Sequence, residues 1–551
     1  MTAVTQVASA VRPWVTRARA HLGNYAFNPL LVRELRSWLR GRRPLVLLTG
    51  YLVVCLGGMI LAALLCQVRS LFRQAPDPAS YGRYMFSGLF ETQVVLVVLI
   101  VLAYSAGAIS LEHEKRTFEM LAVTSLSSLE IVAGKALAVC AFAAMLVLTS
   151  LPLAALCLLL GGISPGEVFL SYGALLLALP LWAAGCVLCS TLVTRTVTSF
   201  VVSLSCLYGL LMGTAMLSIP DSPVCIGLMN PLVASQGYAG FLLLTYHVPA
   251  WVAPLLLYPL FAVVCLVAGA EALPLHQPRR SAVLRTLVTV GFFLLCLLVF
   301  SSLLDQSARR GGSPFTGATL AGDLRTDLAE GLLAVWLFAL VATSVLCSYP
   351  PPREAYDRPV RWLLGRVPVR QWLTRDTRVG WRCALVCHGV GVLGILLPLA
   401  LARHVGMLPG RLDWGTLGRA VFVLALYSLS VLGFSFWISA LAFLWRNRRM
   451  AFVVALMLFG LLNGLAWCHE NDPLAFREAR ELAHPALLTI SPAAAADRAL
   501  GYTESPYWIR EWQDPAYAFA LPLAYQVLFV LGGLAYLRRA ARKGREEEAN
   551  K

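Results

Sequence analysis

The sequence predicts an all-α fold, a polytopic bundle of about 12 helices that cross a membrane, and three observations support this prediction. The 551-residue chain is 58% hydrophobic and only 13% charged, with a mean hydropathy of +0.72, so it has too few charges to cover the surface of a water-soluble protein. Its apolar residues fall into twelve long stretches without Asp, Glu, Lys or Arg. Its basic residues also divide unequally between the two sides that such helices would define.

Each apolar stretch is close to the roughly 20 residues that a helix needs to cross the hydrocarbon core of a bilayer. Helices are the expected spanning element, because lipid offers no hydrogen-bond partners to exposed backbone amides. In chain order, the predicted spans are residues 44–68, 92–110, 136–162, 168–194, 196–219, 248–270, 286–304, 331–348, 383–402, 420–444, 450–468 and 515–537.

The distribution of Lys and Arg predicts the orientation of these helices. With the N-terminus inside, 32 of the 45 basic residues lie in segments on the inner side and 13 in segments on the outer side. This asymmetry follows the positive-inside rule and predicts that both termini are cytoplasmic, in a multi-pass protein of the cell (inner) membrane. The net charge of +16 is therefore a topology signal, and nucleic acid is not an expected partner. Residues 1–26 contain no apolar core of a signal peptide, so the first span is expected to direct insertion.

The second half of the chain repeats the order of features found in the first. The turn at 161–166 has a counterpart at 405–410, and the helix–turn–helix pattern of 189–211 has one at 439–462. Six spans are an even number, so the two halves would form a 6+6 parallel pseudo-repeat; twelve helices without duplication remain the alternative. The expected organisation is a cytoplasmic segment 1–43, a first half 44–280 with a cytoplasmic loop 111–135, a second half 281–538 with an Arg-rich cytoplasmic loop 349–382 and an outer loop 469–514, and a cytoplasmic tail 539–551.

The segment before the first span predicts an amphipathic helix in the cytoplasmic interface of the membrane. Asn28 is suited to cap this helix and Pro29 to its first turn. A basic flank that only sets the topology is the alternative. The predicted apolar face comprises Leu31, Leu35, Trp38 and Leu39, and the charged positions are Arg33, Glu34, Arg36 and Arg40.

The loop 111–135 concentrates charges within an otherwise apolar chain, from Glu112 and Glu114 to Arg116 and Glu119. Residues 117–123 predict a short helix with Thr117 as its cap and with an apolar edge of Phe118, Leu121 and Ala122. The spacing of Ser127 and Glu130 predicts a capping box at the start of the third span. A short helix with an apolar edge among charges is suited to docking on another protein, and an ordinary solvated loop is the alternative.

No stretch of the sequence predicts an enzyme. The nearest candidate for a phosphate-binding loop, Gly134-Lys135-Ala136, lacks the earlier glycine and the hydroxyl residue that such a loop needs. There is no His-Glu-x-x-His pair and no Gly-x-Ser-x-Gly turn. Cys186 and Cys189 have redox-motif spacing but lie in a predicted span, where packing is the expected role. We therefore expect no catalytic, cofactor-binding or metal-binding residues in this chain.

The charged loop and the segments around it resemble one family of membrane proteins. The run Gly107-Ala108-Ile109-Ser110-Leu111-Glu112-x-Glu114-x-Arg116-Thr117-x-Glu119-x-Leu121, with Asn28-Pro29-Leu30 and Ser164-Pro165-Gly166-Glu167, is similar to the ABC-2 type permeases of ATP-driven exporters. The resemblance implies two fused permease halves and a coupling helix that sits on an ATPase subunit. The implied coupling residues are Glu112, Glu114, Arg116, Thr117, Phe118, Glu119 and Leu121. Segment 349–382 shows no comparable run.

We therefore expect the membrane permease subunit of an ABC exporter. Its energy would come from cytoplasmic ATP-binding subunits, two by the resemblance, which would use ATP and Mg and leave no cofactor in this chain. An ion-coupled secondary transporter is the first alternative, because such proteins also commonly have twelve spans in two parallel halves. A membrane scaffold that transports nothing is the second alternative.

Overall fold

The computed structural model describes residues 29–72, 80–123, 126–193, 195–216, 251–273, 281–310, 380–404 and 521–549, with short pieces at 218–219, 222–223, 230–234, 241–243, 246–249 and within 426–440. The chain divides into two compact units. Unit 1 comprises Met1–Ala239 and Ala250–Arg279, and unit 2 comprises Gly240–Pro249 and Arg280–Lys551. Each unit is described by itself below.

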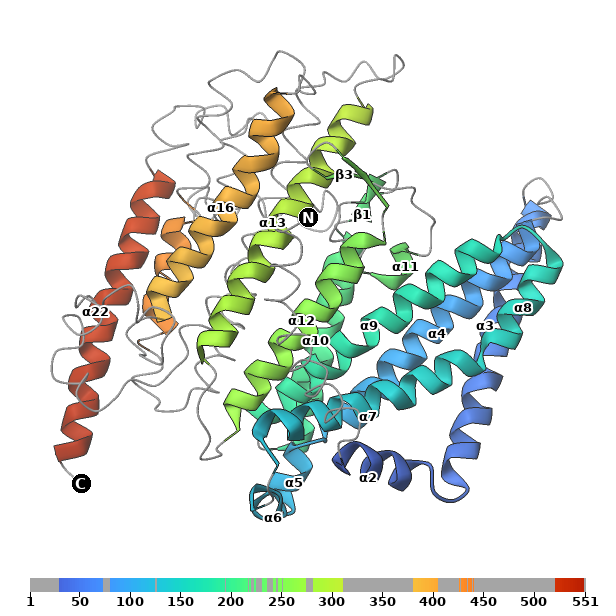
Figure 1. Ribbon diagram of the computed structural model, residues 1–551, viewed down its shortest axis with the longest axis horizontal. Helices are drawn as coiled ribbons and strands as arrows, with labels where there is room; N and C mark the ends of the chain where they lie inside the picture. The colour runs from blue at the N-terminus through green and yellow to red at the C-terminus, as the bar shows by residue number, and fades with distance from the viewer. Residues whose placement is uncertain are drawn as a thin grey trace, which may run out of the picture. The chain divides into compact units, whose positions relative to one another are not determined.

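Unit 1 is a bundle of long helices, and the short helices α2, α5 and α6 lie at one end of it (Figure 1). Its helices are α2 (Pro29–Trp38), α3 (Arg43–Phe72), α4 (Ser80–Ala106), α5 (Ser110–Glu114), α6 (Phe118–Ala122), α7 (Ser128–Thr149), α8 (Leu151–Leu160), α9 (Pro165–Leu192), α10 (Thr196–Met216), α11 (Pro231–Ala234) and α12 (Val252–Ala272). A short hairpin pairs β1 (Ser218–Ile219) with β2 (Ser222–Pro223).

Six helical segments in the described part of the chain are long and apolar enough to cross a membrane. They are Pro44–Val68, Tyr81–Glu114, Ser128–Leu160, Pro165–Leu192, Val252–Ala272 and Val283–Ser302. Each overlaps a span predicted from the sequence, so the prediction of membrane-length helices is confirmed at these positions. The predicted span 196–219 corresponds to α10, and the predicted spans 331–348 and 450–468 lie outside the described residues.

The longest of these segments extends beyond what a bilayer can cover. Tyr81–Glu114 has 34 residues, which at 1.5 Å per residue makes about 51 Å, against a hydrocarbon core of about 30 Å. Gly107, Ala108 and Ile109 form the turn that separates α4 from α5. The segment is therefore too long to lie wholly within the hydrocarbon region, and the charged residues of α5 lie at its C-terminal end.

Two buried cations lie inside candidate spans of the described residues, although the predicted stretches contained no charge. Lys135 is on α7 and is 5% exposed, and Arg285 is on α13 and is 2% exposed. The prediction placed both residues just outside their spans because a charge was used to end each stretch. The helices continue past both charges, and the protein interior surrounds them.

Helix α9 is at the centre of unit 1, where it contacts α12, α7, α4 and α10. Two-thirds of its spanning window is buried, against 17% for α3, which lies at the edge of the unit. Trp182 on α9 and Tyr258 on α12 are among the largest fully buried side chains. The exposed apolar surface of α3 is the surface expected to face lipid.

Unit 2 is described through α13 (Ser281–Arg310), α16 (Gly380–His404), α22 (Leu521–Ala549) and a hairpin of β3 (Phe241–Leu243) with β4 (Tyr246–Val248). Helices α13 and α16 pack closely, because Gly391 and Gly394 leave room for the side chain of Phe292 and the backbone of Phe293. The hairpin packs on α13. The described residues are predominantly helical, as the sequence predicted, and they also contain two short antiparallel hairpins, β1–β2 and β3–β4.

Candidate functional site

The charged loop folds as two short helices joined by a tight turn. Helix α5 ends at Glu114, and Arg116 adopts a left-handed backbone with a φ of 56° before α6 begins at Phe118. This confirms the short helix predicted within 117–123. Ser127 then accepts a hydrogen bond from the Glu130 N–H, and Glu130 accepts one from the Ser127 N–H, which confirms the predicted capping box at the start of α7.

A hydrophobic cluster holds α6 against the bundle. Phe118 is 7% exposed and stacks on His113, with ring centroids 4.2 Å apart. The prediction placed Phe118 on the apolar edge offered to a partner, but its side chain faces the protein interior instead. The buried members of the cluster are Leu30, Ile109, Phe118, Ile131, Val132, Ala136, Val187 and Leu273, from six segments of unit 1.

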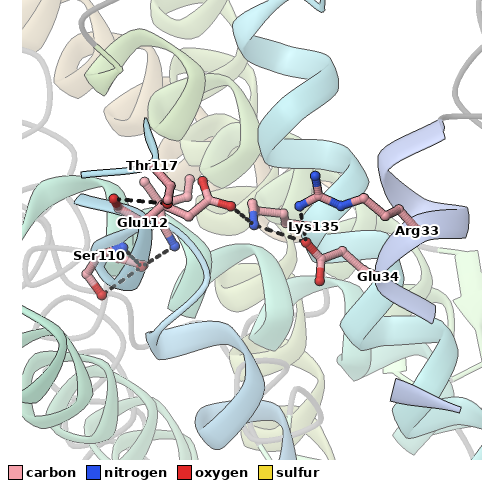
Figure 2. Close-up of polar contacts among 8 residues, drawn as sticks. Arg33, Glu34, Ser110, Glu112, Thr117 and Lys135 are labelled. Carbon is pink, nitrogen blue, oxygen red and sulfur yellow. Dashed lines mark hydrogen bonds and ion pairs between the residues drawn. The ribbon is translucent and has the colours of Figure 1, made fainter. Parts of the chain in front are cut away.

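Lys135 joins the loop to α2 through two carboxylates, as Figure 2 shows. Its Nζ lies 2.8 Å from Glu112 Oε1 on α5 and 3.4 Å from Glu34 Oε1 on α2. The Lys135 side chain is 6% exposed, and those of Glu112 and Glu34 are 18% and 16% exposed. A buried ammonium group is unfavourable without a partner of opposite charge, so this ion cluster requires α2, α5 and α7 to be in place together. The sequence indicated each charge but not their pairing.

A serine of α9 satisfies the first amides of α5. The Ser190 hydroxyl oxygen accepts hydrogen bonds from the Ile109 and Ser110 N–H groups, each at 3.0 Å. Ser110 in turn donates from its hydroxyl to the Ala106 carbonyl oxygen. The first N–H groups of a helix have no intrahelical acceptor, so a hydroxyl from another helix is an effective cap at this buried position.

Glu114 caps the first backbone amide of α10. Its carboxylate accepts hydrogen bonds from the Thr196 N–H at 2.8 Å and from the Thr196 hydroxyl at 2.7 Å. These two bonds lower the pKa of the Glu114 carboxyl, with a smaller contribution from the positive charge of Arg195. A carboxylate at this end also interacts favourably with the dipole of α10. Ser199 of α10 adds a second link, because its hydroxyl donates to the Ala106 carbonyl oxygen at 2.7 Å.

The tip of the loop offers a different set of residues from the one that the sequence suggested. Met120 and Val123 are 76% and 87% exposed, and the side chains of Lys115, Arg116 and Glu119 are exposed beside them. Of the predicted coupling residues, Arg116, Thr117 and Glu119 are exposed, and the Thr117 hydroxyl donates to the Glu112 carbonyl oxygen. Glu112, Glu114 and Phe118 contact the bundle, and the side chain of Leu121 lies outside the described residues.

Helix α2 packs on the bundle through Leu30, Glu34 and Trp38, of which only Trp38 belongs to the predicted apolar face. Leu30 is 3% exposed within the hydrophobic cluster, Glu34 reaches Lys135, and Trp38 contacts Tyr104 and Phe142 with ring centroids 4.8 and 5.9 Å apart. Leu39, predicted on the apolar face, is 45% exposed. Positions 30, 34 and 38 recur every four residues and so share one side of a helix. The sequence missed this side because it includes a charge.

No protein-family model matches this chain, and no curated protein matches it. Among the described residues, no group of three or more His, Cys, Asp or Glu side chains could hold a metal ion. The candidate site is therefore defined by its geometry. It is a short helical loop that is bonded at its base to several long helices and exposes apolar and charged side chains at its tip.

Proposed function

We propose that this protein is the membrane permease subunit of an ABC-type exporter, and that the loop formed by α5 and α6 is the surface on which an ATP-binding subunit docks. The observation that carries the proposal is the contrast between the two ends of this loop. Its tip exposes Met120 and Val123 among charges, and its base is bonded to four helices.

The tip has the composition of a small docking surface. Two highly exposed apolar side chains are rimmed by Lys115, Arg116 and Glu119. An apolar centre with a polar rim is the usual anatomy of a protein–protein interface, and methionine is enriched at such sites. In the proposed topology this loop lies in the cytoplasm, which makes a soluble partner the appropriate occupant.

The base of the loop is suited to transmit a displacement. Glu112 connects it to α7 and, through Lys135, to α2. Ser190 connects it to α9, and Glu114 connects it to α10. A partner that pushes on α6 would therefore move helices of the bundle rather than bend a free loop, which is the behaviour required for ATP hydrolysis outside the membrane to drive a conformational change within it.

The proposed architecture has twelve spans in a 6+6 parallel pseudo-repeat. The protein would lie in the inner membrane of the cell, with both termini in the cytoplasm. Two ATP-binding subunits would hydrolyse ATP with Mg, and this chain would supply the path of the substrate. The excess of basic residues on the inner side and the recurring order of features in the two halves support this arrangement. The apolar spans favour a lipidic or amphipathic substrate over a small ion.

An affinity purification in mild detergent tests the proposal. The tagged wild-type protein is expected to co-purify with an ATP-binding subunit. The variant Met120→Asp/Val123→Asp is expected to lose that subunit, because it places two charges on the docking surface without altering a buried contact. The control is Tyr246→Asp in β4, where the native side chain is 77% exposed, and it should retain the subunit.

Two results would contradict the proposal. If the folded wild-type protein captures no ATP-binding subunit, the exporter assignment fails. If the double variant captures as much of the subunit as the wild type does, docking occurs elsewhere, for example on the second half, and the role given to α6 is wrong.

One feature of unit 2 favours the ion-coupled alternative. His388 lies within α16, is 6% exposed, and its Nε2 is 2.7 Å from the Ser428 hydroxyl oxygen. Buried ionisable groups inside a membrane commonly belong to proton or ion paths. If no ATP-binding subunit co-purifies, proton uptake into proteoliposomes should be compared between the wild type and His388→Gln; a flux that the substitution abolishes would favour this alternative.

A further inference from the structure

The outer side of α2 lies close to the membrane surface. Arg40 and Arg42 precede Pro44, the first residue of a candidate span, by four and two residues. A chain of four residues reaches at most about 14 Å. Gly41, with a φ of 92°, supplies the sharp turn between α2 and α3. With Pro44–Val68 as a membrane span, this short connection would hold the C-terminal half of α2 at the depth of the lipid head groups.

Helix α2 has three edges with distinct chemistry. The inner edge of Leu30, Glu34 and Trp38 packs on the bundle, as described above. A second edge is apolar and contains Val32, Leu35 and Leu39, of which Val32 and Leu39 are 44% and 45% exposed. A third edge contains Arg33, Arg36 and Arg40, all exposed. Within α2 the members of each edge recur at spacings of three or four residues, which places them on one side of the helix. Leu39 and Arg40 directly follow the last residue of α2, and the Leu39 N–H still donates to the Leu35 carbonyl oxygen.

The fold removes the negative charge from the outer surface of this helix. Glu34 is the only acidic residue in the first 72 positions of the sequence. Its carboxylate lies 3.4 Å from the buried Lys135 and 3.4 Å from Arg33, and its side chain is 16% exposed. The remaining charges of α2 and of the turn that follows are all arginines. The outer side is therefore cationic because tertiary packing turns the single carboxylate inward.

We propose that the outer face of α2, formed by Arg33, Arg36, Arg40, Val32 and Leu39, binds the head groups of anionic phospholipids. Guanidinium groups bind phosphate oxygens in a bidentate manner, and basic residues near a membrane surface attract anionic lipids. The adjacent apolar edge selects a lipid over a soluble anion, because Val32 and Leu39 would contact the upper part of the acyl chains. This inference concerns a lipid partner and is independent of the proposed transport function.

Native mass spectrometry of the full-length protein in detergent tests this binding directly. The protein is titrated with equimolar phosphatidylglycerol and phosphatidylcholine that carry the same acyl chains. The wild type is expected to retain phosphatidylglycerol in preference to phosphatidylcholine. Arg36→Gln/Arg40→Gln should weaken phosphatidylglycerol binding by about tenfold or more and leave phosphatidylcholine binding unchanged.

A matched control separates this surface from any other basic flank. Arg538 and Arg539 are an exposed arginine pair on α22, so Arg538→Gln/Arg539→Gln removes the same charge at another position. This control should change phosphatidylglycerol binding by less than about twofold. Equal losses in the two double variants would overturn the assignment to α2, and so would equal retention of both lipids by the wild type.

A second variant distinguishes a lipid from a soluble phosphate. Val32→Ser/Leu39→Ser keeps every arginine and removes the apolar edge. It should reduce the retention of phosphatidylglycerol, whereas unchanged retention would show that only the charged group is recognised and would overturn the lipid assignment. Because Val32 and Leu39 are exposed, the variant should elute and melt like the wild type.

Discussion

Two connections in unit 1 join consecutive long helices in different ways. The loop from α4 to α7 contains α5 and α6, and the turn from α8 to α9 consists of residues 161–164. Both lead into a helix through a serine cap: Ser127 accepts from the Glu130 N–H, and Ser164 accepts from the Glu167 N–H, each at 3.2 Å. The two connections lie at opposite ends of the bundle in Figure 1, and beyond the shared cap they are stabilised by different contacts.

The loop depends on buried polar side chains. Its ion pair, Lys135 with Glu112, is 2.8 Å long, and the two side chains are 6% and 18% exposed. The corresponding pair near the turn, Arg83 with Glu167, is 3.4 Å long, with side chains 64% and 30% exposed. Exposed pairs contribute little because water and salt screen them, whereas a buried pair cannot lose one member without leaving a charge in the interior.

The turn depends on close contact between backbones. Gly161 and Gly162 have φ values of 84° and 81°, which favour glycine. A Cβ on Gly82 would meet the carbonyl oxygens of Gly161 and Cys157. The loop that carries the candidate docking surface is therefore held in place by a buried ion pair. The turn from α8 to α9 is held in place by glycines that allow the backbones of α4 and α8 to touch.

The largest expected effect comes from removing the buried cation. Lys135→Met should lower the free energy of unfolding by about 3 kcal/mol, because Glu112 and Glu34 lose their common partner. Arg83→Met should lower it by less than about 0.5 kcal/mol, since that pair is exposed. Denaturation of both variants in mixed detergent micelles measures the two values. Similar losses would show that burial does not distinguish the two connections.

A smaller effect is expected when a methyl group is added to α4 where it contacts the turn. Gly82→Ala should lower the free energy of unfolding by about 2 kcal/mol, because backbone atoms on α8 cannot move aside easily. Gly107→Ala, in the loop, should be close to neutral, since its Cβ would lie 3.6 Å from the nearest atom of Thr196. The same denaturation experiment applies. If Gly82→Ala does not change the free energy of unfolding, close backbone contact does not stabilise the turn from α8 to α9.

The smallest effect concerns the cap that both connections share. Ser127→Ala and Ser164→Ala should each lower the free energy of unfolding by about 1 kcal/mol, because each removes one hydrogen bond to a helix N-terminus. The two losses should agree within a few tenths of a kcal/mol. A much larger loss for Ser127→Ala would show that the complete capping box at α7 adds stability that the cap at α9 lacks.

Local features of this protein could be predicted from sequence and the contacts across helices could not. The capping box at Ser127 and the short helix near 118–122 depend on residues close together in the chain, so spacing alone indicates them. The pairing of Lys135 with Glu34 joins residues 101 positions apart. A pattern of charges shows that partners are needed, but only the packing of α2 against α7 decides which charges meet.

For the predicted coupling residues, too, the sequence did not show which side chains contact the rest of the protein. The sequence indicated an amphipathic α6 but not which side faces the bundle. Phe118 is buried because it stacks on His113 and joins a cluster built from six segments, and this leaves Met120 and Val123 exposed. The sequence did not indicate that Thr196 and Ser190 bind the loop. Hydroxyl residues are common in apolar helices, and in most cases they donate hydrogen bonds to nearby backbone carbonyl groups of their own helix.

The sequence by itself determined that the described chain consists largely of membrane-length helices, because hydropathy and span length are additive properties of neighbouring residues. It also determined where charge is concentrated between those helices. Only the tertiary structure decided which partner each charged side chain binds and which charged side chains stay exposed. It turned Glu34 inward to Lys135, used Glu114 as the cap of α10, and left arginines on α2 and apolar side chains on α6 at the surface. The physical reason is that a charge in an apolar environment is stabilised by the nearest partner in space, and nearness in space is set by helix packing rather than by position in the chain.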